Sequence, residues 1–285
     1  MLLTPFKAVD YNVTINKFLE FTEYIIHKDT KTYFTGNYGG INFNTGLIDI
    51  KCGGGAGRNF KLVDGVLVPI KDTASIENLE KSLNSSLHRT IDNFYGYALS
   101  NIWQYWVTLT FSSDKVNRND DKQIQYVYKL FRQKMQYINS NVKILAVPER
   151  HKQGQLHLHC LISDIDLKPF LDRAVNPHTN KPIFSNGRAV YNLNLFEYGF
   201  STLINVDSGC NTKLINYVLK YVVKDFGNVG YGKKRFWHTS NLNFRDRIYC
   251  CLSDLDLQEF TANNSNNFYK SCNNFDIYRV ENKKN

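Results

Sequence analysis

The feature that most constrains this chain is the run of residues 149–160, which reads ERHKQGQLHLHC. His157 and His159 alternate there with apolar residues, so a β-strand would direct both imidazoles to one face and the apolar side chains to the other. Gly154 suits the left-handed position of a three-residue turn, and that turn sets Glu149 directly opposite His157. The run therefore predicts a β-hairpin that gathers one carboxylate and two imidazoles on one face of a sheet.

A carboxylate with two imidazoles and open coordination positions is typical of a divalent cation that also takes oxygen atoms from a substrate. Glu149, His157 and His159 are accordingly the predicted ligands of one Mg²⁺ or Mn²⁺ ion. Two other interpretations remain open from the residues alone. The histidines and Glu149 are also compatible with the polar face of a solvated strand, and His151 is a competing ligand.

A second motif follows in residues 213–224, which contain no Gly or Pro and come directly after two N-cap candidates, Asn211 and Thr212. These features predict a helix. Offsets of three and four residues place two tandem Tyr-x-x-Lys units on one stripe of that helix: Tyr217, Lys220, Tyr221 and Lys224. Five apolar residues remain to bury its other faces: Leu214, Val218, Leu219, Val222 and Val223.

The tyrosine stripe has the composition of an assisted nucleophile. A phenol with an ordinary pKa of about 10 reacts poorly at neutral pH, so it needs nearby ammonium groups and a metal that neutralises the attacked phosphate. Tyr217 is the first candidate for this nucleophile and Tyr221 the second, with Lys220 and Lys224 offsetting phosphate charge. The alternative is that the tyrosines pack and the lysines are solvated.

Three segments in order resemble the HUH endonucleases, and within them the rolling-circle replication initiators of small single-stranded DNA phages and plasmids. Residues 106–111 (WVTLTF) resemble the family's hydrophobic strand motif, and residues 156–160 resemble its two-histidine motif. Residues 217–224 resemble its tyrosine motif, where the doubled tyrosine is most similar to the microvirus-like subgroup. The resemblance spans about residues 105–224, and Glu149 stands where related initiators often place a third ligand.

The resemblance implies a metal-dependent enzyme that nicks single-stranded origin DNA. It implies a 5′-phosphotyrosine product, a free 3′-hydroxyl that primes a host DNA polymerase, and later strand rejoining with Tyr221 as the second acceptor. The glycine-rich segment 52–58 lacks the Lys-Ser/Thr ending of a phosphate loop, so a host helicase is the expected partner. Two alternatives remain: a relaxase or single-strand transposase of the same class, and a nucleic-acid-binding module without catalysis.

The charge of the chain agrees with a polyanionic partner. Lys and Arg number 35 against 26 Asp and Glu, which gives a net charge of +9. Basic residues concentrate in residues 213–247, where aromatic residues are interleaved with them in the manner of single-stranded nucleic-acid sites. We expect four residues of this segment to contact DNA: Lys233, Lys234, Arg235 and Trp237.

The order of predicted elements is a strand over 105–111, a helix over 120–138, a hairpin over 142–163, a polar loop over 168–187, a strand over 200–206 and the tyrosine helix. This order predicts an α+β fold, a central antiparallel sheet with helices packed on its faces, as in HUH/RRM-like domains. Three parts are expected: a β-rich N-terminal addition to this sheet with a connecting helix over 76–99 (residues 1–100), the endonuclease domain (101–250) and a polar, Asn-rich, loosely ordered tail (251–285).

The six cysteines include no C-x-x-C pair, which argues against structural zinc. The first residues lack the basic head and apolar core of a signal peptide, and no run of 18 apolar residues occurs. We therefore expect no membrane association. Reduced thiols in the cytoplasm of a bacterial host fit these features best.

Overall fold

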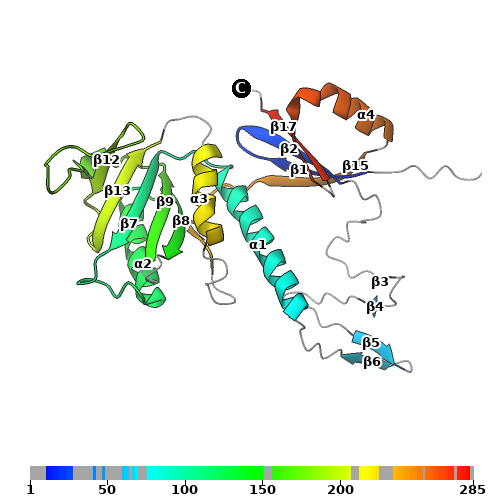
Figure 1. Cartoon of the computed structure of the whole chain (residues 1–285), viewed down its shortest axis with the longest axis horizontal. Coiled ribbons are helices and arrows are strands. Elements are labelled where there is room, and N and C mark those ends of the chain that lie inside the picture. The colour runs from blue at the N-terminus through cyan, green and yellow to red at the C-terminus, as the bar shows by residue number, and fades with distance from the viewer. Residues whose placement is uncertain are drawn as a thin grey trace, which may run out of the picture. The chain divides into compact units, whose positions relative to one another are not determined.

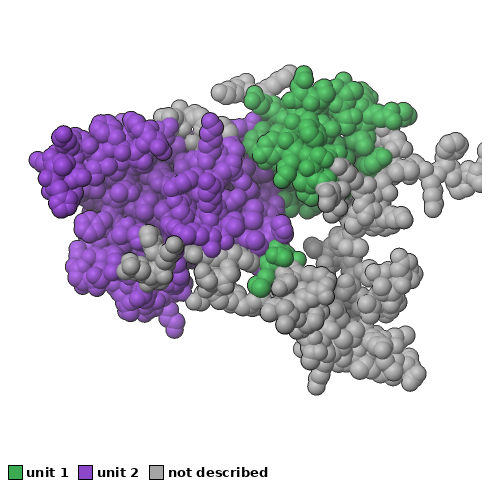
Figure 2. All heavy atoms as spheres, in the orientation of Figure 1, with its two compact units in different colours: residues 1–17, 21–85, 247–283 green, residues 18–20, 86–246, 284–285 purple. Residues whose placement is uncertain are grey.

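The computed structural model describes residues 11–27, 41–42, 47–48, 60–63, 66–69, 76–150, 156–206, 212–224, 234–252, 254–272 and 275–282. The chain divides into two compact units (Figure 2). Unit 1 consists of residues 1–17, 21–85 and 247–283, and unit 2 consists of residues 18–20, 86–246 and 284–285. Among the described helices, none combines the length and the apolar character that a membrane crossing needs.

Unit 2 is built on an antiparallel sheet with the strand order β10-β12-β13-β7-β9-β8-β14, and β11 pairs with β12 (Figure 1). The strands are β7 (Tyr105–Phe111), β8 (Lys143–Arg150), β9 (Leu156–Ser163), β10 (Leu171–Arg173), β11 (Phe184–Ser185), β12 (Arg188–Leu193), β13 (Gly199–Asn205) and β14 (Trp237–His238). The predicted strands are confirmed as β7, β8, β9 and β13. The hairpin turn with His151 and Gly154 lies outside the described residues.

One face of this sheet is covered by α2 (Asp121–Ile138), which confirms the predicted helix. Its N-cap is Asp120, whose carboxylate accepts a hydrogen bond from the backbone N–H of Lys122 at 2.8 Å. The helix buries a stripe at helical spacing, and this stripe packs against the alternate apolar residues of β7, β8 and β9. The stripe consists of Ile124, Val127, Tyr128, Phe131 and Met135. The resulting core fixes which strand residues point to the opposite face.

The opposite face carries α3 (Thr212–Lys224), which lies against β8 (Figure 1). The helix predicted over residues 213–224 is thus confirmed. Its buried stripe is Ile215, Val218 and Val222, which follow the three- and four-residue spacing of one helical face. The prediction that Val223 is buried is wrong: it is 39% exposed, because it lies about 100° around the helix from Val222.

The connecting helix is confirmed as α1 (Ile76–Ala98), whose residues from Ser86 onward belong to unit 2. The polar loop expected over 168–187 is wrong in part, because this segment contains η1 (Lys168–Phe170), β10 and β11. Short strands of two or three residues carry too little alternation to be recognised, and they form here because β12 offers them a partner. Residues 174–183 between them remain without a strand or helix.

Unit 1 contains a five-stranded sheet with the order β15-β1-β2-β17-β16 and a second sheet with the order β3-β4-β5-β6. The strands are β1 (Tyr11–Lys17), β2 (Phe21–His27), β3 (Ile41–Asn42), β4 (Leu47–Ile48), β5 (Phe60–Val63), β6 (Val66–Pro69), β15 (Asp246–Leu252), β16 (Phe268–Ser271) and β17 (Phe275–Glu281). The N-terminal region is therefore β-rich, as predicted. Its strands form sheets of their own, so the expectation that they extend the main sheet is wrong.

The expectation of a loosely ordered C-terminal tail is also wrong. Residues 254–281 contain α4 (Asp254–Asn263), η2 (Ser265–Asn267), β16 and β17. β17 pairs with β2 over seven residue pairs, from Phe275 with His27 to Glu281 with Phe21. α4 packs on this sheet through Phe260, whose ring centroid lies 4.9 Å from that of Tyr24. The Asn-rich composition concealed a strand whose partner lies at the other end of the chain.

Candidate active site

The floor of the candidate site is the sheet face that looks toward α3. The register of β8 and β9 places Glu149 opposite His157, as the sequence predicts. The register of β7 and β9 places Thr108 opposite His159 and Thr110 opposite His157. The intervening residues of β9 point into the core beneath α2. The strict alternation of β9 therefore separates a core face from a polar face, as predicted.

Both imidazoles are held by threonine side chains. The Oγ1 atom of Thr108 lies 3.1 Å from Nδ1 of His159, and the Oγ1 atom of Thr110 lies 3.1 Å from Nδ1 of His157. In the tautomer that donates from Nδ1–H to the hydroxyl, the Nε2 atom keeps its lone pair for a metal ion. Sequence reasoning did not single out these threonines. The available signal was the alternation of polar and apolar residues within residues 106–111.

Glu149 is a buried carboxylate with two polar partners. Its Oε1 atom lies 2.5 Å from Nζ of Lys224, and its Oε2 atom lies 2.7 Å from Nε2 of His159. Burial raises the pKa of Glu149, but hydrogen bonds from Lys224 and His159 and their charges lower it more, so the net shift is downward. Glu149 is thus ionised at neutral pH. The ammonium of Lys224 lies on this carboxylate, a contact that the sequence did not indicate.

The two tyrosines of α3 lie next to the histidine strand. The ring of Tyr221 stacks on that of His159, with centroids 3.9 Å apart and planes 16° apart. The Tyr221 hydroxyl donates a hydrogen bond to the Tyr217 hydroxyl at 2.6 Å. Burial, followed by this hydrogen bond and by the charges of Tyr217 and Glu149, raises the pKa of Tyr221. Tyr221 therefore keeps its proton and acts as the donor of the pair.

Tyr217 is the more accessible phenol, because it is 47% exposed whereas Tyr221 is half-buried. Its ring lies 5.5 Å from that of Trp106, a buried residue of β7 that also lies 5.6 Å from the ring of His159. The Nζ atom of Lys220 lies 5.8 Å from the centre of the Tyr217 ring. Trp106 thus forms a rigid aromatic support shared by the first-choice nucleophile and a histidine, a role that the sequence did not reveal.

The donor set was tested for its fit to a divalent cation. Two ligands about 2.1 Å from an octahedral ion and at right angles to one another lie about 3 Å apart, and the carboxylate oxygen of Glu149 lies 2.7 Å from Nε2 of His159. These two side chains fit neighbouring coordination positions. In the described part of the chain, no three His, Cys, Asp or Glu side chains form a closed metal cluster. His157 shares the face but is not drawn into the pair, and Lys224 contacts the carboxylate instead.

The residues predicted to contact DNA lie elsewhere in unit 2. Lys233 is outside the described residues, whereas Lys234, Arg235 and Trp237 line one cavity beside β14. The ring of Trp237 lies 5.1 Å from that of Tyr128 on α2, so this cavity belongs to the α2 side of the sheet. A basic residue of the same segment, Arg245, is buried in an ion pair with Asp92 and is therefore neutralised.

Comparison with known families agrees with this geometry. Residues 104–226 match the model of a family described as Replication-associated protein, of the ORF2 type. The matched segment runs from β7 through α3 and includes the carboxylate, both histidines and both tyrosines of the site. The match covers less than half of the chain, and no curated protein and no solved structure matches the chain significantly. The matched segment supports a replication-initiator family and a role in DNA replication.

Proposed function

We propose that this protein is a rolling-circle replication initiator of the HUH endonuclease class, which nicks single-stranded origin DNA through Tyr217. The observation that carries the proposal is the position of a Tyr-x-x-Lys helix against the two-histidine strand, with the Tyr221 ring 3.9 Å from that of His159. The family match over residues 104–226 supports it independently. The proposed location is the cytoplasm of a bacterial host.

Three side chains would hold one Mg²⁺ or Mn²⁺ ion: Glu149, His157 and His159. The bound ion would withdraw electron density from a non-bridging oxygen of the scissile phosphate. Thr108 and Thr110 orient the two imidazoles through their Nδ1 atoms, 3.1 Å from each hydroxyl. Lys224, which neutralises Glu149, and Lys220, near the Tyr217 ring, both carry positive charge to the side of the sheet where the phosphate would lie.

Tyr217 is the proposed first nucleophile because its hydroxyl is accessible and accepts a hydrogen bond from Tyr221. A donor at that distance stabilises the negative charge that develops on the attacking oxygen. The Tyr217 oxygen forms a bond to phosphorus and releases its proton to water. The bond from phosphorus to the 3′ oxygen breaks, and the leaving oxygen takes a proton from water.

The products are a 5′-phosphotyrosine and a free 3′-hydroxyl. One phosphodiester is exchanged for another, so rejoining needs no nucleotide cofactor. We propose that Tyr221 accepts the strand in the second transfer, which the 2.6 Å separation of the two hydroxyls favours. A host polymerase would extend the 3′-hydroxyl, and a host helicase would open the duplex.

The proposal is tested with a labelled single-stranded origin fragment and Mn²⁺, with covalent adducts resolved on a denaturing gel. We expect an adduct with the unmodified protein and with Tyr221→Phe, and none with Tyr217→Phe. Tyr126→Phe is the matched control, because Tyr126 is an exposed tyrosine of α2 away from the site. Failure of the unmodified protein to form an adduct with any origin fragment would refute nicking. Loss of the adduct only in Tyr221→Phe would reverse the order of the two nucleophiles.

A further inference from the structure

A cavity of about 900 Å³ lies in unit 2 at the β14 edge of the sheet. Its walls come from the unit-2 part of α1, from α2 and from the segment 234–240. Trp237, one of its lining residues, packs against the core beneath α2, whereas Glu149 and His159 lie under α3. The cavity is therefore distinct from the candidate active site.

The cavity is lined with positive charge. Its four cationic residues are Lys129, Arg132, Lys234 and Arg235, and none of the described residues that line it is acidic. Amide groups of Asn93, Gln125 and Gln136 add hydrogen-bonding capacity to the same walls. A concave surface that combines several cations with neutral donors and acceptors attracts an anionic ligand.

Aromatic side chains form the remaining wall. The ring of Tyr97 lies 4.3 Å from that of His238 and 4.7 Å from that of Phe244, and Phe236 lies 6.3 Å from Tyr97. On the α2 side, Trp237 and Tyr128 lie 5.1 Å apart with planes 32° apart. Aromatic rings interleaved with cations are the combination on which nucleic-acid bases stack while their phosphates are neutralised.

Two polar atoms of the lining residues lack a partner within the described part of the protein. The Tyr128 hydroxyl and the Arg132 Nε atom are buried and make no hydrogen bond there. Tyr128 as a whole is 5% exposed, so water does not readily replace the missing partner. Uncompensated polar atoms on the wall of a cationic cavity are what a site built for a polar ligand would leave in the ligand's absence.

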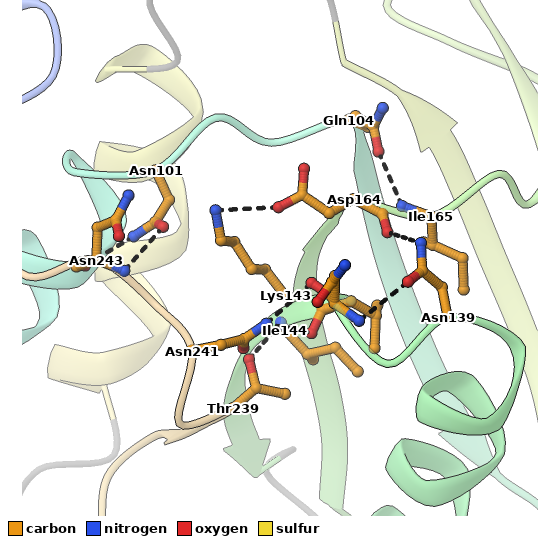
Figure 3. A network of polar contacts seen from close by, with 12 residues as sticks. Asn101, Gln104, Asn139, Lys143, Ile144, Asp164, Ile165, Thr239, Asn241 and Asn243 are labelled. Atoms are coloured by element: carbon orange, nitrogen blue, oxygen red, sulfur yellow. Dashed lines mark hydrogen bonds and ion pairs between the residues drawn. The ribbon is translucent and has the colours of Figure 1, made fainter.

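The wall formed by residues 234–240 is held in place by hydrogen bonds to β8 and to the loop after α1. β14 pairs with β8, and the backbone N–H of Thr239 donates to the Ile144 carbonyl at 3.0 Å. Figure 3 shows this anchorage continuing through Asn241 and through Asn243, whose backbone N–H donates to Asn101 at 3.1 Å. A cavity wall fixed in this way is pre-organised for binding.

We propose that this cavity binds a base and adjacent phosphates of single-stranded DNA, away from the nucleotide that is cut. The assignment to DNA, rather than to a free nucleotide, rests on the proposed function. The same base-and-phosphate chemistry would recognise a mononucleotide, and the experiment below separates the two sources. The cavity would hold a flanking part of the origin strand and so contribute affinity to a site whose reacting residues lie under α3.

The test compares two double charge reversals by fluorescence anisotropy with a labelled single-stranded oligonucleotide, without metal and in a Tyr217→Phe background, so that binding is read apart from chemistry. The cavity variant is Lys129→Glu with Lys234→Glu, both exposed lining residues. The control is Lys122→Glu with Lys168→Glu, which makes the same charge change at exposed positions outside the cavity.

We expect the cavity variant to bind at least tenfold more weakly than the control, with the slope of log affinity against log salt reduced by about 1.4 for two lost phosphate contacts. Tyr128→Phe, which removes the unpartnered hydroxyl, should weaken binding severalfold without loss of folding. Equal affinity of the two charge variants would overturn the proposal. Displacement of the oligonucleotide by millimolar dATP would assign the cavity to a free nucleotide and overturn the DNA assignment.

The outcomes also separate this inference from the nicking proposal. If the cavity variant loses binding as expected but the unmodified protein forms no covalent adduct, the cavity assignment stands and the nicking proposal fails. If the unmodified protein forms the adduct but the cavity and control variants bind equally, the nicking proposal stands and the cavity assignment fails.

Discussion

The contact between Lys224 and Glu149 yields two opposite expectations for one substitution. Lys224→Met keeps most of the aliphatic stem and removes the ammonium that lies 2.5 Å from the carboxylate. A hydrogen bond between charged groups contributes about 1.5 to 3 kcal/mol. Because the Lys224 side chain is 54% exposed, solvent screening reduces this contribution to about 1 kcal/mol. We therefore expect the variant to be less stable than the unmodified protein by about 1 kcal/mol at pH 7.

The same substitution should change the pH dependence of stability. The folded-state pKa of Glu149 lies below its ordinary value of 4.5, so its ionisation stabilises the folded protein above pH 4.5. This contribution is lost as the pH falls through the folded-state pKa. Removing the Lys224 ammonium raises that pKa, because burial then opposes only the hydrogen bond from His159. The stability difference between the two proteins should therefore shrink toward zero as the solution becomes more acidic.

Metal affinity should move in the opposite direction. The Lys224 ammonium and a divalent cation compete for the same carboxylate, so Lys224→Met should bind Mn²⁺ about tenfold more tightly, or by about 1.4 kcal/mol. Urea unfolding between pH 7 and pH 3 and titration calorimetry with Mn²⁺ measure the two effects. Lys220→Met is the matched control on the same helix, and it should change neither quantity appreciably. Weaker metal binding in Lys224→Met, or equal destabilisation by both variants, would refute the reasoning.

Two further substitutions test the support of the site. Thr108→Val removes the hydroxyl 3.1 Å from Nδ1 of His159 and should weaken Mn²⁺ binding about 10- to 100-fold in calorimetry; unchanged affinity would remove Thr108 from the orientation of the imidazole. Gly199→Ala would place a Cβ atom 2.1 Å from the Thr110 carbonyl oxygen and 2.6 Å from the Ser112 nitrogen, both backbone atoms. It should lower the free energy of unfolding by about 2 kcal/mol or more in urea, and a loss below about 0.5 kcal/mol would contradict this strand packing.

Local pattern was sufficient for much of the site. The alternation of His157 and His159 with apolar residues identified β9 and its two faces, and the turn chemistry gave the register that pairs Glu149 with His157. The tyrosine helix followed from a stretch without Gly or Pro. In each case the deciding information lay within about a dozen residues of sequence, where periodicity and turn preferences act directly.

Contacts between distant segments could not be read in this way. Lys224 meets Glu149 only because α3 crosses the sheet, and Trp106 lies beside Tyr217 for the same reason. The pairing of β17 with β2 joins the two ends of the chain, and local composition pointed to disorder instead. Such contacts depend on how elements pack, which periodicity within one element does not encode.

The most direct measurement of the central claim is the identity of the residue that carries DNA. Trypsin cleaves after Lys213, Lys220 and Lys224, so the two tyrosines fall in different peptides, residues 214–220 and 221–224. After a short reaction with origin strand and Mn²⁺, digestion with nuclease and trypsin is followed by mass spectrometry. We predict a nucleotide adduct on the peptide 214–220, which contains Tyr217. An adduct only on 221–224, or on neither peptide, would contradict the account.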